Sequence, residues 1–246
     1  MKRGLYIAAG VAAFLVFMVA MIPAGQLAQR LPPGIELSGV DGTIWSGRAR
    51  ALAVEGRTFG PIEWSCRPWR LLILEWSCRV GMTPQGGAVS GDVSGDFGGE
   101  IAGHGITGRL PISAFEGIAT PRGWTGALEL DVREIRLFDR RPAFASGTIY
   151  LRSLRAPGAS GQMLGDFELV VGEGTVGGEV LNGRLRDLGG PLHVRGVVEL
   201  SRDGRYLLTG EAAPGPGAGP AIFDTLGFLG PPDSQGRRPF TIEGTL

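Results

Sequence analysis

The sequence predicts an all-β fold, in which a single N-terminal transmembrane helix precedes a large, curved, mostly antiparallel sheet with one or two short helices. Apolar and polar residues alternate with a period of two over many short segments, as in strands that bury one face. Glycine is abundant, with 43 residues scattered among these segments, which is typical of tight turns and bulges. No long helical segments alternate with the strands, which excludes a doubly wound α/β sheet.

Residues 1–24 are expected to form a membrane anchor. The run from Leu5 to Ile22 carries no charge, and as a helix it would reach about 27 Å, close to one hydrocarbon core. Lys2 and Arg3 precede it and should stay in the cytoplasm. The alternative is a removable signal peptide cleaved near Pro23, although signal cores usually contain only about 7 to 15 residues. Both interpretations place the remaining chain outside the cytoplasm.

Residues 25–36 form a proline-containing linker, and residues 37–246 are expected to form the β-rich domain. Strands are predicted within 37–54 and 61–66, because Leu52 and Val54 share one parity, as do Ile62, Trp64 and Cys66. Residues 68–74 break this pattern with a short apolar turn that can be helical. A further strand is expected through Trp76 and Cys78.

The second half of the chain shows weaker and then clearer alternation. Residues 88–110 are rich in glycine, so side chains define the register of these strands poorly. Residues 111–124 resemble a connector and a potential domain boundary. Clear strands are expected around 128–133, 149–152 and 167–171.

The clearest hairpin lies in residues 192–209, with its turn at Asp203-Gly204. A two-residue loop would pair Leu200 with Leu207, whereas a three-residue loop would pair Leu200 with Tyr206 and keep the apolar face intact. We favour the three-residue loop. A short amphipathic helix at 221–229 and a terminal strand ending at Leu246 complete the chain.

The two cysteines lie in a local duplication, because Glu63-Trp-Ser-Cys-Arg67 recurs as Glu75-Trp-Ser-Cys-Arg79. In an oxidising compartment such a pair is expected to form one disulfide, Cys66–Cys78. Two buried free thiols are the alternative.

The sequence carries no pattern typical of an enzyme or of a cofactor site. Basic and acidic residues balance at 24 each, so no nucleic-acid partner is expected. Nucleophile-elbow, phosphate-loop and zinc motifs are absent from the sequence. His104 and His193 lack ligand spacing, and Asp92 and Asp96 match calcium loops poorly. We therefore expect no catalytic residue, cofactor or metal.

Several motifs resemble the protein N family of the bacterial type II secretion system in their order and spacing. Two of them are Gly60-Pro-Ile-Glu-Trp64 and Leu226-Gly227 before Gly236-Arg237. The residues that define the resemblance, mostly structural in type, are Gly42, Ile44, Trp45, Gly47, Trp64, Pro68, Gly190, Pro191 and Leu192. The cysteine pair is not part of the family pattern.

The resemblance implies a non-catalytic, single-pass protein of the bacterial inner membrane, with a cytoplasmic N-terminus and a periplasmic main domain. Its implied role is to scaffold the inner-membrane platform, with the other platform components as partners. An alternative is a lipid-binding or lipid-transfer protein, because a one-sided curved sheet resembles the half-open groove of periplasmic AsmA-like proteins. The apolar groove would then include Val198, Leu200, Tyr206 and Leu208.

Overall fold

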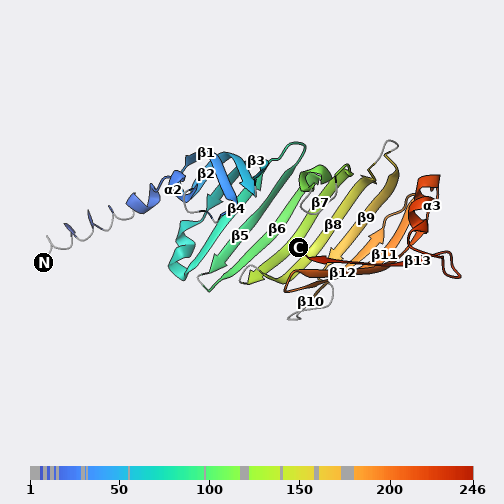
Figure 1. Cartoon of the computed structure of the whole chain (residues 1–246). Helices are drawn as coiled ribbons and strands as arrows, with labels where there is room; N and C mark the ends of the chain where they lie inside the picture. The colour runs from blue at the N-terminus through green and yellow to red at the C-terminus, as the bar shows by residue number, and fades with distance from the viewer. Residues whose placement is uncertain are drawn as a thin grey trace. The chain divides into compact units, whose positions relative to one another are not determined.

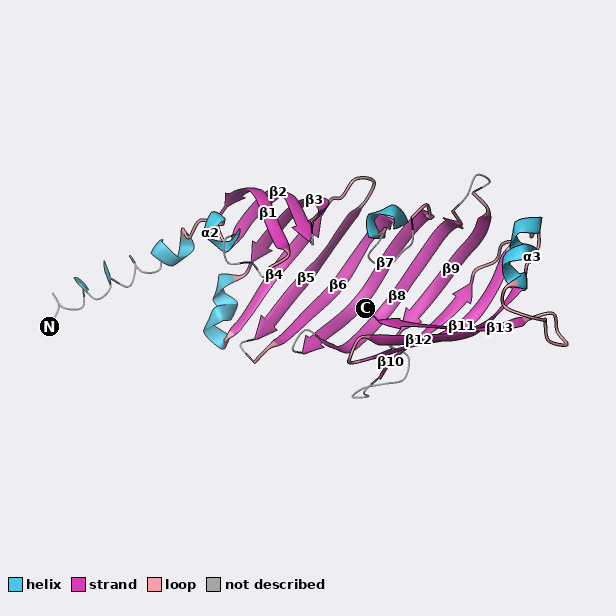
Figure 2. Cartoon of the chain, in the orientation of Figure 1, coloured by secondary structure: helices cyan, strands magenta, loops and turns pink. Residues whose placement is uncertain are grey.

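The computed structural model describes residues 6–7, 10–11, 14, 17–28, 31, 33–54, 56–96, 98–116, 122–138, 141–157, 161–172 and 180–245. The chain divides into two compact units, Met1–Gln85 and Gly86–Leu246. The described residues include thirteen strands, and the helices among them are short (Figure 2). The prediction of an all-β, antiparallel fold is confirmed.

The first unit is an antiparallel meander of four strands in chain order. Its elements are α2 (Gly25–Ala28), β1 (Ile35–Gly42), β2 (Ser46–Val54), β3 (Arg57–Cys66), η1 (Pro68–Ile73) and β4 (Glu75–Met82). The short turn predicted at 68–74 is therefore a 3-10 helix. Pro68 begins it, because proline needs no backbone donor at that position.

The second unit is an antiparallel sheet of nine strands, each paired with the next along the chain. The strands are β5 (Ala88–Asp96), β6 (Glu100–Pro111), β7 (Thr125–Phe138), β8 (Arg141–Arg155), β9 (Met163–Val171), β10 (Val180–Asp187), β11 (Leu192–Ser201), β12 (Arg205–Pro214) and β13 (Arg238–Thr245). Two short helices accompany them, η2 (Ile112–Phe115) and α3 (Pro220–Gly227).

The β11–β12 hairpin has the predicted three-residue loop. Leu200 pairs with Tyr206 and Val198 pairs with Leu208, so the apolar side chains stay on one face. Gly204 has a φ of +85°, a left-handed conformation that glycine adopts without a steric penalty.

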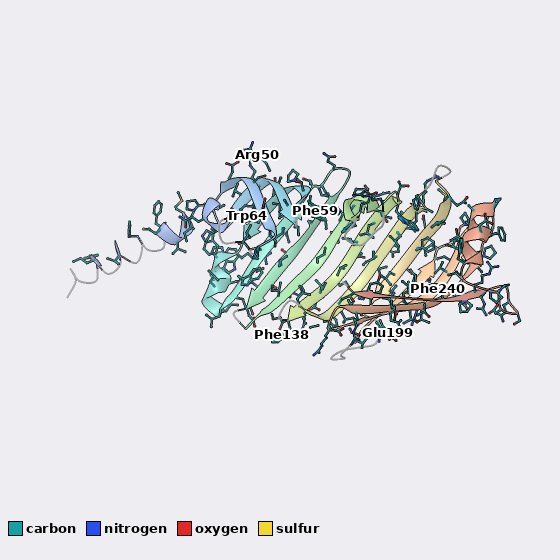
Figure 3. The ribbon with its side chains drawn as sticks, in the orientation of Figure 1. Arg50, Phe59, Trp64, Phe138, Glu199 and Phe240 are labelled. Atoms are coloured by element: carbon teal, nitrogen blue, oxygen red, sulfur yellow. A yellow bond between two sulfur atoms is a disulfide. The ribbon has the colours of Figure 1, made fainter. Side chains whose placement is uncertain are left out.

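The sheet of the second unit is bent, and its two faces differ in chemistry. Figure 1 shows β5 to β9 face-on, whereas β12 and β13 are seen almost edge-on. Figure 3 shows Phe240 of β13 on the side of the bend that faces β5 to β9, and Glu199 of β11 on the opposite side. The apolar face thus lines the inside of the bend.

One short helix covers the end of this apolar face. Ile222 and Leu226 of α3 are 2% and 3% exposed and pack against Ala212 of β12. Partly buried side chains surround this small core, among them Leu192, Val194 and Phe240. The predicted amphipathic helix at 221–229 is therefore present, although Leu229 lies beyond its end and is exposed.

The predicted anchor is described only in part. Of Leu5–Ile22, residues 5, 8–9, 12–13 and 15–16 lie outside the described residues, as do residues 117–121 of the connector at 111–124. Within the described part of the chain, no helix is long and apolar enough to cross a membrane.

Candidate functional site

The first cluster of motif residues forms the turn between β1 and β2. Gly42 has a φ of +95°, and a side chain there would come within 2.5 Å of the Ser46 carbonyl oxygen. A Cβ on Gly47 would lie 2.5 Å from the ring of Trp64, so the indole packs directly on the Gly47 backbone. The indole Nε1 of Trp64 donates a hydrogen bond to the Thr43 carbonyl at 3.2 Å. Both glycines thus permit a tight turn beneath a tryptophan.

This turn also holds the end of the N-terminal segment. The indole Nε1 of Trp45 donates to the Val19 carbonyl at 2.8 Å, and the Ile44 amide donates to the Ile22 carbonyl at 3.1 Å. The Ala24 amide donates to the Gly42 carbonyl at 3.0 Å. Ala24 is 1% exposed, so the chain that leaves the predicted anchor is fixed to the β1–β2 turn.

The cysteines lie beside this turn. Cys66 of β3 pairs directly with Cys78 of β4, and the structure joins them by the predicted disulfide. The Cys66 amide donates to the Trp45 carbonyl at 2.6 Å. The disulfide therefore closes the base of a loop that contains η1 and begins at Pro68.

The remaining motif residues lie in the second unit, at the turn between β10 and β11. Gly190 has a φ of +136°, and a Cβ there would come within 3.0 Å of Gly165. The Pro191 carbonyl accepts a hydrogen bond from the Gly215 amide at 2.8 Å, and Leu192 packs against the α3 core. The motif residues thus form two separate clusters, one in each unit.

The four residues of the predicted groove share the apolar face of β11 and β12. Val198 and Leu200 lie opposite Leu208 and Tyr206, and all four side chains are partly exposed. On the neighbouring strands, Leu181 and Ile242 continue this face.

The opposite face carries a row of six charged side chains and one tyrosine, one from each of seven strands at the same register position. The row consists of Arg109, Glu129, Tyr150, Glu168, Arg186, Arg195 and Glu211. We call it the ion-pair row. Arg109 lies 3.4 Å from Glu129, which also accepts from Arg152 at 3.1 Å. Arg186 pairs with Glu168, and Glu211 pairs with Arg237 at 2.5 Å.

Two carboxylates of the second unit have lowered pKa values. The hydrogen bond from Arg186 lowers the pKa of Glu168 below its ordinary value, although burial works in the opposite direction. Burial also raises the pKa of Asp187, but hydrogen bonds from His193 and from the Gly189 and Val194 amides outweigh it and hold the pKa below its usual range. Both groups are therefore charged at neutral pH.

A hollow of about 530 Å³ lies at the end of the ion-pair row. Its lining includes three arginines, Arg186, Arg195 and Arg237, and two carboxylates, Asp187 and Glu211. Such a surface can pair with charged groups of a partner. Within the described residues, no group of three or more histidine, cysteine, aspartate or glutamate side chains could hold a metal ion.

Comparison with known proteins assigns the family. A family model described as "Type II secretion system (T2SS), protein N" matches residues 33–241, most of the chain. The chain belongs to the type II secretion system protein N family. It is therefore a component of the type II secretion machinery, which fits a location in the bacterial cell envelope.

Curated members of the protein N family match over most of their length. The type II secretion system protein N of Aeromonas hydrophila is 29% identical over 262 residues, covering 100% of both chains. That of Vibrio cholerae is 25% identical over 229 residues, covering 88% of this chain and 87% of the relative. No solved structure matches the chain.

Sequence reasoning missed the ion-pair row of this chain. The sequence did show these charged residues at the polar positions of segments in which polar and apolar residues alternate, for example Glu129 between Leu128 and Leu130. Their alignment in one row depends on the register of seven strands, which alternation alone does not determine.

Without Arg186, the carboxylate of Glu168 would lose a hydrogen bond but would still be removed from water, because Glu168 is only 6% exposed. The Arg186→Gln variant is expected to lower the free energy of unfolding of the second unit by about 1 kcal/mol at neutral pH, because the Arg186 side chain is more than half exposed. Because the folded pKa of Glu168 is lowered, this stabilisation is present above the unfolded value of about 4.3 and is lost as the pH falls through the folded value. Urea unfolding at about pH 7 and about pH 3 measures the difference.

Arg195→Gln is the matched control, because Arg195 lies opposite Arg186 on the next strand and is exposed. It should change the free energy of unfolding by less than about 0.5 kcal/mol. Equal losses for the two variants, or a loss for Arg186→Gln that is independent of pH, would contradict the role given to Glu168.

Proposed function

We propose that the chain is a non-catalytic component of the inner-membrane platform of the type II secretion machinery. Residues 1–24 anchor it in the inner membrane, residues 25–36 link the anchor to the body, and residues 37–246 form a periplasmic domain. This domain scaffolds the assembly of the other platform components. Membership of the protein N family is the observation that carries the proposal.

The composition of the N-terminal segment supports an anchor. Its described residues expose large apolar side chains, namely Tyr6, Ile7, Val11, Phe14, Phe17, Met18, Val19 and Met21. Exposed apolar surface of this extent is unfavourable in water, and a bilayer would cover it. The hydrogen bonds from the β1–β2 turn to Val19 and Ile22 would then hold the first unit close to the membrane surface.

The charged face of the second unit supports the scaffolding role. Its hollow and the ion-pair row offer arginines and carboxylates to charged partners. A second hollow of about 660 Å³, lined by Arg184, Val197 and Thr209 among others, adjoins it. Val197 is 47% exposed on this face, so an apolar contact lies among the charges, as in many protein interfaces.

A pair of adjacent valines tests the scaffolding role in cells. Val197 and Val198 are neighbours on β11 that face opposite sides of the sheet. A photo-crosslinker placed at residue 197 should capture other platform components, whereas one at residue 198 should capture them at most weakly. Capture of platform proteins from 198 alone, or from neither position, would contradict a scaffold that acts through the charged face.

The second candidate function is the binding of lipid acyl chains. The partly exposed apolar face, with Val198, Leu200, Tyr206 and Leu208, favours it because such a surface suits acyl chains. Mass spectrometry of the protein extracted from its native membrane would detect bound phospholipid. Phospholipid that is retained by the wild type and lost from a Leu200→Glu variant would support the lipid carrier. No retained phospholipid would leave the scaffold as the function.

A further inference from the structure

The loop between β3 and β4 exposes a group of large apolar side chains. Trp69, Ile73 and Leu74 are 63%, 64% and 69% exposed. All three lie in or directly after η1 (Pro68–Ile73). Soluble surfaces rarely keep a tryptophan and two aliphatic side chains this exposed within six residues, and such groups mark sites of interaction.

The backbone that carries this group includes an energetically unfavourable conformation at Leu74. Leu74 has a φ of +60°, a left-handed conformation that is uncommon for residues other than glycine. Its amide donates to the Leu71 carbonyl at 3.1 Å and so ends the 3-10 helix. Neither this conformation nor the exposure of the leucine side chain stabilises the isolated fold.

The disulfide closes the base of the loop. Cys66 and Cys78 bracket it, and the Arg67 amide donates to the Ser77 carbonyl at 2.8 Å across its base. A loop closed in this way keeps its exposed side chains in one arrangement, which reduces the entropy that binding would cost.

Hydrogen bonds through the β1–β2 turn connect the loop to the end of the N-terminal segment. The Cys66 amide donates a hydrogen bond to the Trp45 carbonyl, and the Trp45 indole donates one to the Val19 carbonyl. Figure 2 shows the η1 helix at the edge of the first unit from which the N-terminal segment leaves. The loop that contains η1 and the end of the N-terminal segment are therefore both held by Trp45.

We infer that η1 inserts into the interfacial layer of a phospholipid bilayer, with Trp69, Ile73 and Leu74 among the upper acyl chains. A tryptophan flanked by aliphatic residues is the composition that prefers the membrane–water interface. Two arginines, Arg67 and Arg70, stand against one glutamate in this segment, and Glu75 lies 3.1 Å from Arg70. The segment thus keeps a net positive charge for anionic headgroups.

This inference rests on the proposed anchor, because only an anchored chain brings the loop to the bilayer. It adds a second membrane contact, which would prevent the first unit from rotating freely about a single helix. The first unit would then keep one orientation at the membrane surface.

Quenching by brominated lipids tests the inference on the full chain. The protein is reconstituted into vesicles of phosphatidylcholine and phosphatidylglycerol whose acyl chains carry bromine either near the headgroup or near the bilayer centre. The fluorescence that the shallow bromines quench should come from Trp69 and from Trp45, the other tryptophan beside the N-terminal segment. Trp69→Phe should therefore roughly halve the quenched fluorescence. Quenching of Trp69 by the deep bromines should be weaker.

Trp76→Phe is the matched control, since Trp76 lies in β4 of the same unit and is partly buried. It should leave the quenching by shallow bromines unchanged. The inference is overturned if Trp69→Phe leaves this quenching unchanged, or if both variants reduce it equally. A loop that binds a protein partner in place of lipid would give the first of these results.

Extraction with alkaline carbonate separates the two proposals. Protein that resists extraction while Trp69 is not quenched would overturn the interfacial loop and leave the anchor intact. Protein that carbonate releases would overturn the anchor itself, and with it the loop.

Discussion

Replacement of Ile222 by alanine is expected to lower the free energy of unfolding of the second unit by about 3 to 4 kcal/mol. Ile222 is 2% exposed and packs with Ala212 and Leu226 in the small core beneath α3. The substitution removes buried carbon atoms and leaves a cavity that β12 cannot readily fill, because its backbone is held by pairing on both sides. Urea unfolding followed by circular dichroism measures the change.

Phe223→Ala is the control on the same helix. Phe223 is 51% exposed, so a larger side chain is removed from a less buried position. Its loss should lower the free energy of unfolding by less than about 1 kcal/mol. A loss for Phe223→Ala equal to that for Ile222→Ala would show that α3 does not pack on the sheet as described.

Removal of the disulfide should have an effect of similar size in the first unit. The C66S/C78S double variant is expected to lower the free energy of unfolding of this unit by about 3 kcal/mol, the chain-entropy estimate for a loop of this length. The two cysteines are separated by 12 residues along the chain. The loop containing η1 should also become more accessible to protease, because the bond closes its base.

The redox state of the cysteines provides the check on this prediction. Reduction of the wild type should reproduce the loss seen in the double variant, and Ser65→Ala, which changes an exposed neighbour of Cys66, should have little effect. A count of two free thiols in the denatured, non-reduced protein would contradict the disulfide.

The strands of this protein were predictable because alternation is a local property. Leu128 and Leu130 flank Glu129 in the sequence and face opposite ways from it in β7. The β11–β12 hairpin was predictable in register as well, since Gly204 and the apolar face of Val198 and Leu200 favour the same loop. The disulfide followed from the duplicated segment around Cys66 and Cys78.

Contacts between distant segments were not predictable in this way. The bond from the Trp45 indole to the Val19 carbonyl joins residues that share no periodic pattern. The exposure of Trp69 was also missed, because a tryptophan in an apolar turn is as consistent with a core as with a surface. Burial depends on what packs above a residue, and its own sequence neighbours do not specify that.

The sequence by itself determined the strand-rich composition, the turns, the cysteine pair and the resemblance to the protein N family, because each of these depends on residues close together in the chain. Only the tertiary structure decided which charged residues form the ion-pair row, which side chains α3 buries and which remain exposed on η1. The physical reason is that these features depend on strand register and on packing between segments. Side-chain alternation does not determine the register of strands such as β5 and β6, and their glycines have no side chains that could favour one register over another.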